Sequence, residues 1–429
     1  MSPHFNGEVV AAAERTIRDL IDAALSLKGN GAVIGEAPAG AGKSYAVASA
    51  AFEALKRGLR VAVATPTNEQ AASLIDELCA RCPDDLKISA VLAGAVALPD
   101  HLSRHPAVQT KSAKEANAER LLVATLSKLG DAHGRGDLGR VDLLIIDEAF
   151  QANAVHYYGV GGLAARHLLM GDRGQLAPFT TAPNGDRWRG LNEDPLLTAV
   201  EVVTRNHADK TQTFKLPITR RLDTRGAAVA RAFYPGHAFS SALNPDARAL
   251  TFSAPADPAE PLDALLDYAA VSGWLHLEQP GPALTLADRG TVALLVALAA
   301  RLLARRPATT CERHAAPKPL PQEELAVVVS HNDQKALLRA ALDAVGLGGV
   351  VVNTANKLQG LTYEVVIAWH PLAGLTEVDE FHLDPGRLCV MLTRHRHLCL
   401  LVGRAEDRRL VEGLPPSAPT YATWSGAPA

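Results

Sequence analysis

The sequence predicts an α/β fold made of two lobes, each built on a mostly parallel sheet. Short apolar runs alternate with Ala-rich stretches of helical character along the 429 residues, as in chains of strand–helix–strand units. The hydrophobic fraction of 48% can supply a sizeable core, which excludes a wholly disordered chain. Two series of strand-like runs are separated by a less regular stretch. We therefore place the boundary between the lobes near residues 211–221.

The first lobe is expected over residues 1–210 and opens with an amphipathic helix within residues 1–30. Residues 83–120 are polar with scattered basic side chains, and we interpret them as a small insertion in this lobe. The strands expected in the first lobe are Ala32–Glu36, Arg60–Thr65, Leu121–Thr125, Val141–Asp147 and His167–Gly171.

The second lobe is expected over residues 211–412, beginning with an irregular stretch up to about residue 321. Its proline-containing residues 304–321 predict a surface loop or short linker. Residues 413–429 carry Pro415, Pro416 and Pro419 near their start and predict a loose C-terminal tail. The strands expected in this lobe are Leu325–Ser330, Gly349–Thr354, Tyr363–Trp369 and His397–Val402.

The overall charge excludes one class of protein and leaves another open. The 43 Lys and Arg residues against 46 Asp and Glu residues argue against a polycation that coats nucleic acid, but a local basic groove remains compatible with this total. Five thinly spread cysteines do not form a disulfide framework and favour a reducing, cytoplasmic location. The longest apolar run, Val292–Ala300, is shorter than the roughly 20 residues of a membrane helix.

A phosphate-binding loop is predicted where the first strand meets the following helix. The residues Gly35-Glu36-Ala37-Pro38-Ala39-Gly40-Ala41-Gly42-Lys43-Ser44 place small side chains before a Lys-Ser pair. Gly40 and Gly42 let backbone amides approach phosphate oxygens at a helix N-terminus. Lys43 can reach the β- and γ-phosphates, and the Ser44 hydroxyl can ligate Mg²⁺. Ala37 stands where the usual pattern has its first glycine.

An acidic pair ends a strand 104 residues after the loop. The apolar run from Val141 leads to Asp147 and Glu148. At the tip of a buried strand, Asp147 can hold Mg²⁺, and Glu148 can polarise an attacking water. A solvated acidic helix start would explain the same two residues. The phosphate-binding loop upstream favours the catalytic interpretation.

Further segments follow in a fixed order along the chain. They are residues 64–68 (ATPTN), 123–127 (VATLS), 169–176 (LMGDRGQL), 216–221 (LPITRR), 327–334 (VVVSHNDQ), 354–360 (TANKLQG) and 391–396 (MLTRHR). Together with the loop and the acidic pair, they resemble the motif series of superfamily 1 helicases of the UvrD and RecD type. The resemblance covers residues from about 30 to 404. It implies two tandem RecA-like domains, with the P-loop and Walker B motif in the first and arginine fingers in the second.

The resemblance also implies hydrolysis of ATP with Mg²⁺. The implied catalytic residues are Glu148, Gln175, Arg221 and Arg394. The implied nucleotide-binding residues are Gly40, Gly42, Lys43, Ser44, Asp147, Arg220, Gln359 and Gly360. Arg220 replaces the aromatic residue that usually packs on adenine, which leaves the strictness of the ATP preference open, although a guanidinium can also stack on a base.

Neutral donors at strand ends are the implied nucleic-acid contacts, since hydroxyl, amide and backbone N–H groups hold phosphates. These residues are Thr65, Thr67, Asn68, Thr125, Thr354 and Asn356. Two interpretations of Trp188 stay open: stacking on a base, as in the Trp-Arg-Gly element of UvrD-type helicases, or packing against the lobe surface. Family analogy favours DNA over RNA.

Two functions from different classes are consistent with the motifs. The first is a monomeric motor that moves along single-stranded nucleic acid and unwinds duplexes. The alternative is a regulatory ATPase triggered by nucleic acid or by a protein partner, which the small accessory regions favour. A P-loop kinase is disfavoured because the second lobe carries helicase-like motifs instead of an acceptor site.

Overall fold

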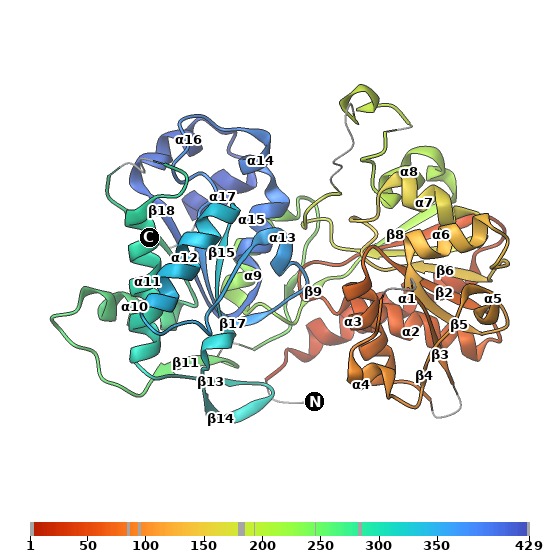
Figure 1. Ribbon diagram of the computed structural model, residues 1–429, viewed down its shortest axis with the longest axis horizontal. Coiled ribbons are helices and arrows are strands. Elements are labelled where there is room, and N and C mark those ends of the chain that lie inside the picture. The colour runs from red at the N-terminus through yellow and green to blue at the C-terminus, as the bar shows by residue number, and fades with distance from the viewer. Residues whose placement is uncertain are drawn as a thin grey trace. The chain divides into compact units, whose positions relative to one another are not determined.

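The computed structural model divides into two compact α/β units. The N-terminal unit comprises residues 11–173 and 177–217, and the C-terminal unit comprises residues 1–10, 174–176 and 218–429. Each unit contains its own parallel sheet (Figure 1), which confirms the predicted fold class. The described residues are 4–83, 86–92, 96–178, 185–192, 194–244, 246–281 and 285–426.

The sheet of the N-terminal unit has the strand order β4-β3-β5-β2-β6-β7-β1-β8. Every neighbouring pair runs parallel. The central strands are buried along their whole length, because helices cover both faces of a parallel sheet. The strands are β1 (Gly31–Glu36), β2 (Val61–Thr65), β3 (Ile88–Val91), β4 (Val108–Thr110), β5 (Leu121–Thr125), β6 (Leu143–Ile146), β7 (Arg166–Gly171) and β8 (Thr211–Lys215).

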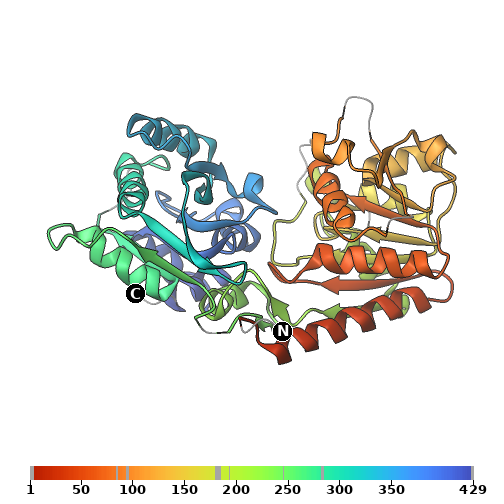
Figure 2. The same cartoon turned by 90° about the horizontal axis from the view of Figure 1, so that it is seen from below.

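Helices form a layer on each face of this sheet. The last three α-helices of the unit share one apolar core with alternate residues of β1, β2, β5 and β6, and the long first helix lies with the next two on the other face (Figures 1 and 2). The α-helices are α1 (Gly7–Ser26), α2 (Lys43–Lys56), α3 (Asn68–Cys79), α4 (Asp100–Ser103), α5 (Ala113–Ala116), α6 (Leu126–Gly134), α7 (Ala154–Gly161) and α8 (Ala199–Asn206). Short 3₁₀ turns are η1 (Gly185–Trp188) and η2 (Ala208–Lys210).

The described part of residues 83–120 belongs largely to the central sheet. Its strands β3 and β4 extend the sheet beyond β5; α4 connects β3 to β4, and α5 connects β4 to β5. Strand β8 pairs with β1 and so belongs to the first sheet. The division between the units falls after Pro217, within the range of residues 211–221 in which the boundary was predicted.

The C-terminal unit is built on a parallel sheet with the order β12-β18-β17-β15-β16. An antiparallel sheet, β11-β13-β14, and the short pair β9 and β10 stand beside it. The strands are β9 (Ile218–Thr219), β10 (Ser240–Ser241), β11 (Ala249–Phe252), β12 (Trp274–Gln279), β13 (Pro307–Cys311), β14 (His314–Pro319), β15 (Leu325–Val329), β16 (Val351–Thr354), β17 (Tyr363–Trp369) and β18 (His395–Arg404).

Two apolar cores cover the two faces of this parallel sheet. The α-helices of the unit are α9 (Thr224–Ala230), α10 (Pro261–Ser272), α11 (Arg289–Ala304), α12 (Asn332–Ala344), α13 (Ala355–Leu358), α14 (Glu380–Leu383), α15 (Pro385–Leu392), α16 (Arg408–Glu412) and α17 (Pro419–Gly426). The 3₁₀ turns are η3 (Arg231–Phe233), η4 (Gln322–Glu324) and η5 (Ala405–Asp407). No helix among the described residues is long and apolar enough to cross a membrane.

Two segments of this unit differ from their predictions. Residues 304–321, predicted as a loop or linker, contain the hairpin β13–β14. Its prolines are compatible with a sheet because β14 is an edge strand. The predicted loose tail contains α17, and its Trp424 is buried against the rings of His276 and His370.

Candidate nucleotide and nucleic-acid site

The carboxyl ends of the parallel strands collect the predicted site residues of the N-terminal unit at one edge of its sheet. Strand β1 runs into the phosphate-binding loop, β6 precedes Asp147, and β2 and β5 end at Thr65 and Thr125. In open parallel sheets this edge is where ligands bind. The fold therefore places the loop, the acidic pair and two of the predicted nucleic-acid contacts on the same side of one sheet.

The phosphate-binding loop has the backbone that its glycines allow. Gly40 and Gly42 adopt positive φ angles of 76° and 88°, a conformation that side chains with a Cβ rarely adopt. Gly42 caps α2, so Lys43 and Ser44 form the first turn of that helix. Ala37, which replaces the usual first glycine, is buried and donates its amide to the Gly171 carbonyl at 2.8 Å. Alanine at this position is therefore compatible with the backbone pairing that continues from β1 and β7.

Lys43 forms an ion pair with Glu148, which joins the loop to the acidic pair. Burial by itself lowers the pKa of Lys43, but the nearby Glu148, Asp147 and Asp172 carboxylates outweigh this and raise it. The lysine is therefore a permanent cation among carboxylates. A phosphate group that binds Lys43 must compete with Glu148 for the ammonium.

Asp147 lies at the tip of β6 and is only 5% exposed. Burial raises its pKa to about 6, with Lys43 opposing and Glu148 adding to the shift. One of its carboxylate oxygens accepts the Glu148 amide at 2.9 Å. A carboxylate at this strand tip and the Ser44 hydroxyl are hard oxygen donors, which Mg²⁺ prefers together with phosphate and water. The donor set therefore fits Mg²⁺ held by Ser44 and Asp147.

Glu148 has a strained backbone, with a φ angle of 57° in the left-handed region. Such conformations in residues other than glycine cost free energy and concentrate at functional sites. Its side chain is held from two directions. Lys43 binds one carboxylate oxygen, and the Gln151 amide donates to the other at 2.9 Å. The sequence motifs did not predict a role for Gln151. Its position three residues after Glu148 is the feature that could have indicated one.

Gln175 lies in the segment that belongs to the C-terminal unit, where it meets a second predicted site residue. The Gln359 amide donates to its side-chain oxygen at 2.9 Å. A Cβ at Gly386 would stand 2.6 Å from the Gln175 carbonyl oxygen, so glycine is needed at the start of α15 for this close approach. The structure thus brings together two residues that lie 184 positions apart.

The predicted arginine fingers lie close together in the C-terminal unit. Arg221 donates to the Thr393 carbonyl at 3.1 Å, and Arg394 is the next residue. The Arg394 guanidinium is fully buried and donates to the Val390 carbonyl and the Thr393 hydroxyl. Its Nη1 has no hydrogen-bond partner among the described residues. To bind a phosphate, Arg394 must therefore turn away from α15.

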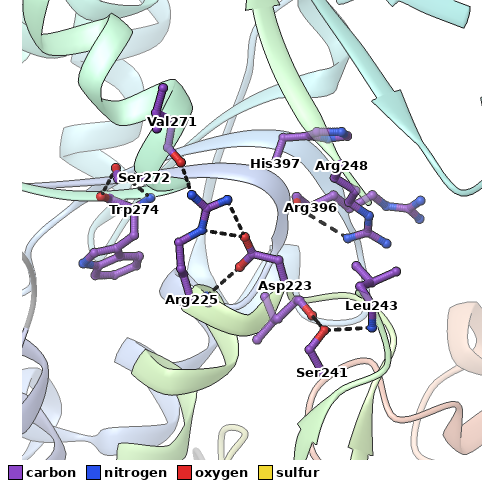
Figure 3. A network of polar contacts seen from close by, with 12 residues as sticks. Asp223, Arg225, Ser241, Leu243, Arg248, Val271, Ser272, Trp274, Arg396 and His397 are labelled. Atoms are coloured by element: carbon purple, nitrogen blue, oxygen red, sulfur yellow. Dashed lines mark hydrogen bonds and ion pairs between the residues drawn. The ribbon is translucent and has the colours of Figure 1, made fainter. Parts of the chain in front are cut away.

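Arg248 organises the backbone around both of these arginine segments, and no motif predicted it. It donates to the carbonyls of Arg220, Arg221 and Arg396. A two-point ion pair with Glu312, at 2.6 and 2.9 Å, holds it in place. Figure 3 shows this side chain directed towards Arg396, with the pair of Asp223 and Arg225 nearby.

The predicted nucleic-acid contacts have different surroundings. Thr67 is exposed and Asn68 partly exposed at the N-terminus of α3, and Thr125 caps α6. In the C-terminal unit, Thr354 precedes α13, and the exposed Asn356 accepts a hydrogen bond from Arg387 at 3.1 Å. Thr354 is the last residue of β16, and Asn356 lies two positions further on.

Trp188 lies in η1 and is 38% exposed. The Arg187 guanidinium stands 5.0 Å from the centre of its ring. Trp188 is therefore not part of an apolar core in this conformation. One face of the indole is matched with a cation, an arrangement compatible with either of the two interpretations of this residue.

Comparison with known proteins shows what part of the N-terminal unit is similar to. Residues 17–157 match the family model of the DEAD/DEAH box helicases. This span includes the phosphate-binding loop and the Asp147-Glu148 pair, so the part of the chain that is similar to these helicases contains both halves of the predicted nucleotide site. No curated protein matches the chain significantly.

Among solved structures, the chain is similar to an Arterivirus nonstructural protein 10 (helicase) in complex with DNA. The TM-score is 0.46 and the sequence identity is 13%. The alignment covers 92% of this chain and 63% of that helicase chain. The chain therefore spans less than two thirds of the helicase to which it is similar.

Proposed function

We propose that the protein is an ATP-dependent nucleic-acid motor of the superfamily 1 type. It would couple hydrolysis of Mg-ATP to movement along single-stranded DNA and separate duplexes. The observation that carries the proposal is the ion pair of Lys43 with Glu148. It joins a phosphate-binding loop to the acidic strand tip within a domain that matches a helicase family model.

The residues of the N-terminal unit divide the chemistry among them. Backbone amides of the glycine loop and Lys43 bind phosphate oxygens, since both are donors at a helix N-terminus. Ser44 and Asp147 would hold Mg²⁺, which supplies charge neutralisation at the phosphates. Glu148, once released from Lys43, accepts a proton from the attacking water. Its release is required because the ion pair holds a carboxylate oxygen on Lys43 and away from the water.

Residues of the C-terminal unit supply the remaining contacts in this proposal. Arg221 and Arg394 stabilise the charge on the transferring phosphoryl group. Arg220, Gln359 and Gly360 contact the nucleotide, and Gln175 senses the γ-phosphate. The bond between Gln175 and Gln359 supports a shared role for these two residues.

The test is a Mg-ATPase assay with single-stranded DNA, duplex DNA, RNA and no nucleic acid. We expect single-stranded DNA to raise turnover severalfold and Lys43→Ala to abolish it. Lys56→Ala is the matched control, because this lysine ends the same helix with a side chain 72% exposed. Tailed duplexes with either end labelled then report unwinding and polarity.

Each arm of the assay has a consequence. Stimulation by RNA and not by DNA would show that the nucleic-acid substrate is RNA and not the proposed DNA. Hydrolysis without stimulation by any nucleic acid would overturn the motor and favour the regulatory ATPase, whose rate a protein partner controls. Retained hydrolysis in Lys43→Ala would remove the phosphate-binding loop from the mechanism.

A further inference from the structure

A chain of side-chain hydrogen bonds connects Glu148 to the predicted nucleic-acid segment of the same unit. The Gln151 amide donates to the Glu148 carboxylate at 2.9 Å, and the Gln70 amide donates to Gln151 at 3.0 Å. The Gln70 side-chain oxygen then accepts the Thr67 backbone N–H at 3.2 Å. All of these residues belong to the N-terminal unit.

The two ends of this chain determine its direction. A carboxylate can only accept, so Gln151 must present its NH₂ group to Glu148. The side-chain oxygen of Gln151 is therefore left for the NH₂ group of Gln70. A backbone N–H can only donate, so Gln70 must present its oxygen to Thr67. One orientation of the two amides satisfies every bond, and reversal of either places two oxygens together.

Local sequence explains how Gln70 can serve both partners. Thr67 is the N-cap of α3 and Gln70 is its third residue, so the two form a reciprocal capping box. The box uses the oxygen of the Gln70 amide and leaves its NH₂ group for Gln151. Gln151 follows Glu148 in the turn after β6, where its backbone amide donates to the Glu148 carbonyl at 2.8 Å.

We propose that Gln151 and Gln70 restrain Glu148, and that nucleic acid bound at Thr67 releases it. This inference rests on the proposed function and adds the path by which the substrate regulates hydrolysis. A phosphate oxygen at the N-terminus of α3 takes the Thr67 N–H from Gln70, because both are acceptors for one donor. Gln70 then loses its anchor and Gln151 loses its partner.

The release has a direct chemical effect on Glu148. The Gln151 amide and the Lys43 ammonium hold the two carboxylate oxygens of Glu148 in one orientation. Without the amide, one oxygen is released and the carboxylate is free to turn towards an attacking water. Gln70 and Gln151 are thus positioning residues that act through Glu148.

Two variants should interrupt this series of hydrogen bonds at different positions without disturbing the fold. Gln70→Glu retains an acceptor for the capping box, in which glutamate is a favoured third residue, and removes the donor to Gln151. Gln151→Met keeps a side chain of similar length and removes both bonds. Gln212→Met is the matched control, since this glutamine is exposed on β8 of the same unit.

The measurement is ATPase turnover at saturating ATP, with and without single-stranded DNA, together with the KM for ATP and the Kd for DNA. We expect both variants to raise basal turnover about threefold or more, the effect of losing one ordinary hydrogen bond of the network. Stimulated turnover, KM and the Gln151→Met Kd should stay within about twofold of wild type. The basal turnover of the double variant should equal that of the single variants, because both substitutions interrupt the same series of hydrogen bonds.

The outcomes separate this inference from the proposed function. Wild-type stimulation that survives unchanged in both variants overturns the restraint and leaves the motor intact. Lower basal turnover in both also overturns it, because the glutamines would then assist Glu148. An unstimulated wild-type enzyme overturns the motor and the restraint together.

Discussion

Replacement of Arg248 by methionine should destabilise the C-terminal unit strongly. Arg248 is 9% exposed, and its guanidinium binds Glu312 and three backbone carbonyls. Burial by itself would raise the pKa of Glu312, but the hydrogen bonds and charge of Arg248 outweigh burial and lower it. Removing the arginine therefore leaves a buried carboxylate without its cation.

The expected loss follows from that uncompensated charge. Breaking a buried ion pair from one side costs about 3–5 kcal/mol, whereas replacing both partners by apolar residues is often close to neutral. With a urea m-value of about 3 kcal/mol/M, the midpoint should fall by about 1 M or more. The double variant Arg248→Met with Glu312→Leu should recover most of the loss.

Tryptophan fluorescence can follow this unit selectively. Trp274, Trp369 and Trp424 are buried in the C-terminal unit, whereas Trp188 is exposed in the other. Urea titrations of the full chain would compare the wild type, the two single variants and the double variant. A loss below about 1 kcal/mol for Arg248→Met, or a double variant no more stable than the single variants, would refute this stabilising role of Arg248.

Three further substitutions test the arginine finger, the exposed tryptophan and the buried histidines. Arg394→Ala should leave the Kd for ATP nearly unchanged and lower turnover by about 10³-fold, and normal turnover in a quench assay would remove its finger role. Trp188→Ala should weaken single-stranded DNA binding by about 5- to 100-fold in an anisotropy titration if the ring stacks on a base; an unchanged Kd would favour packing. Burial lowers the pKa of His276 to about 4 and that of His370 well below its usual value. Because the unfolded chain binds protons that these folded residues exclude, stability should fall as the pH drops from 6.5 towards 4, by up to about 3 kcal/mol for His276. His276→Leu should flatten this dependence in urea titrations, and an unchanged slope would contradict it.

The local sequence pattern was sufficient to predict the strands that carry the motifs. The observed β5 and β17 have the predicted bounds, and β1, β2, β7 and β15 differ by a residue at one end. Each of these strands contains an apolar run that ends at, or is followed by, a glycine or a polar residue, so hydrophobicity and turn chemistry indicate similar boundaries. The loop and the acidic pair were predictable for the same reason, because each follows such a strand.

Segments whose conformation depends on distant partners were not predictable. Prolines in residues 304–321 indicated a loop, but β13 pairs with β11, 50 or more residues earlier in the chain. The C-terminal prolines likewise gave no indication that Trp424 packs on His276 and His370. Gln70 and Arg248 act through partners 81 and 64 positions away. Their roles appear only when the fold brings those partners together.

The central claim is that nucleic acid controls hydrolysis at Lys43 and Glu148. The most direct measurement is the steady-state Mg-ATPase rate of the full chain, titrated with a single-stranded DNA oligonucleotide. We expect a saturable increase of severalfold or more that is absent in Lys43→Ala. A wild-type rate that neither DNA nor RNA changes at any concentration would contradict it.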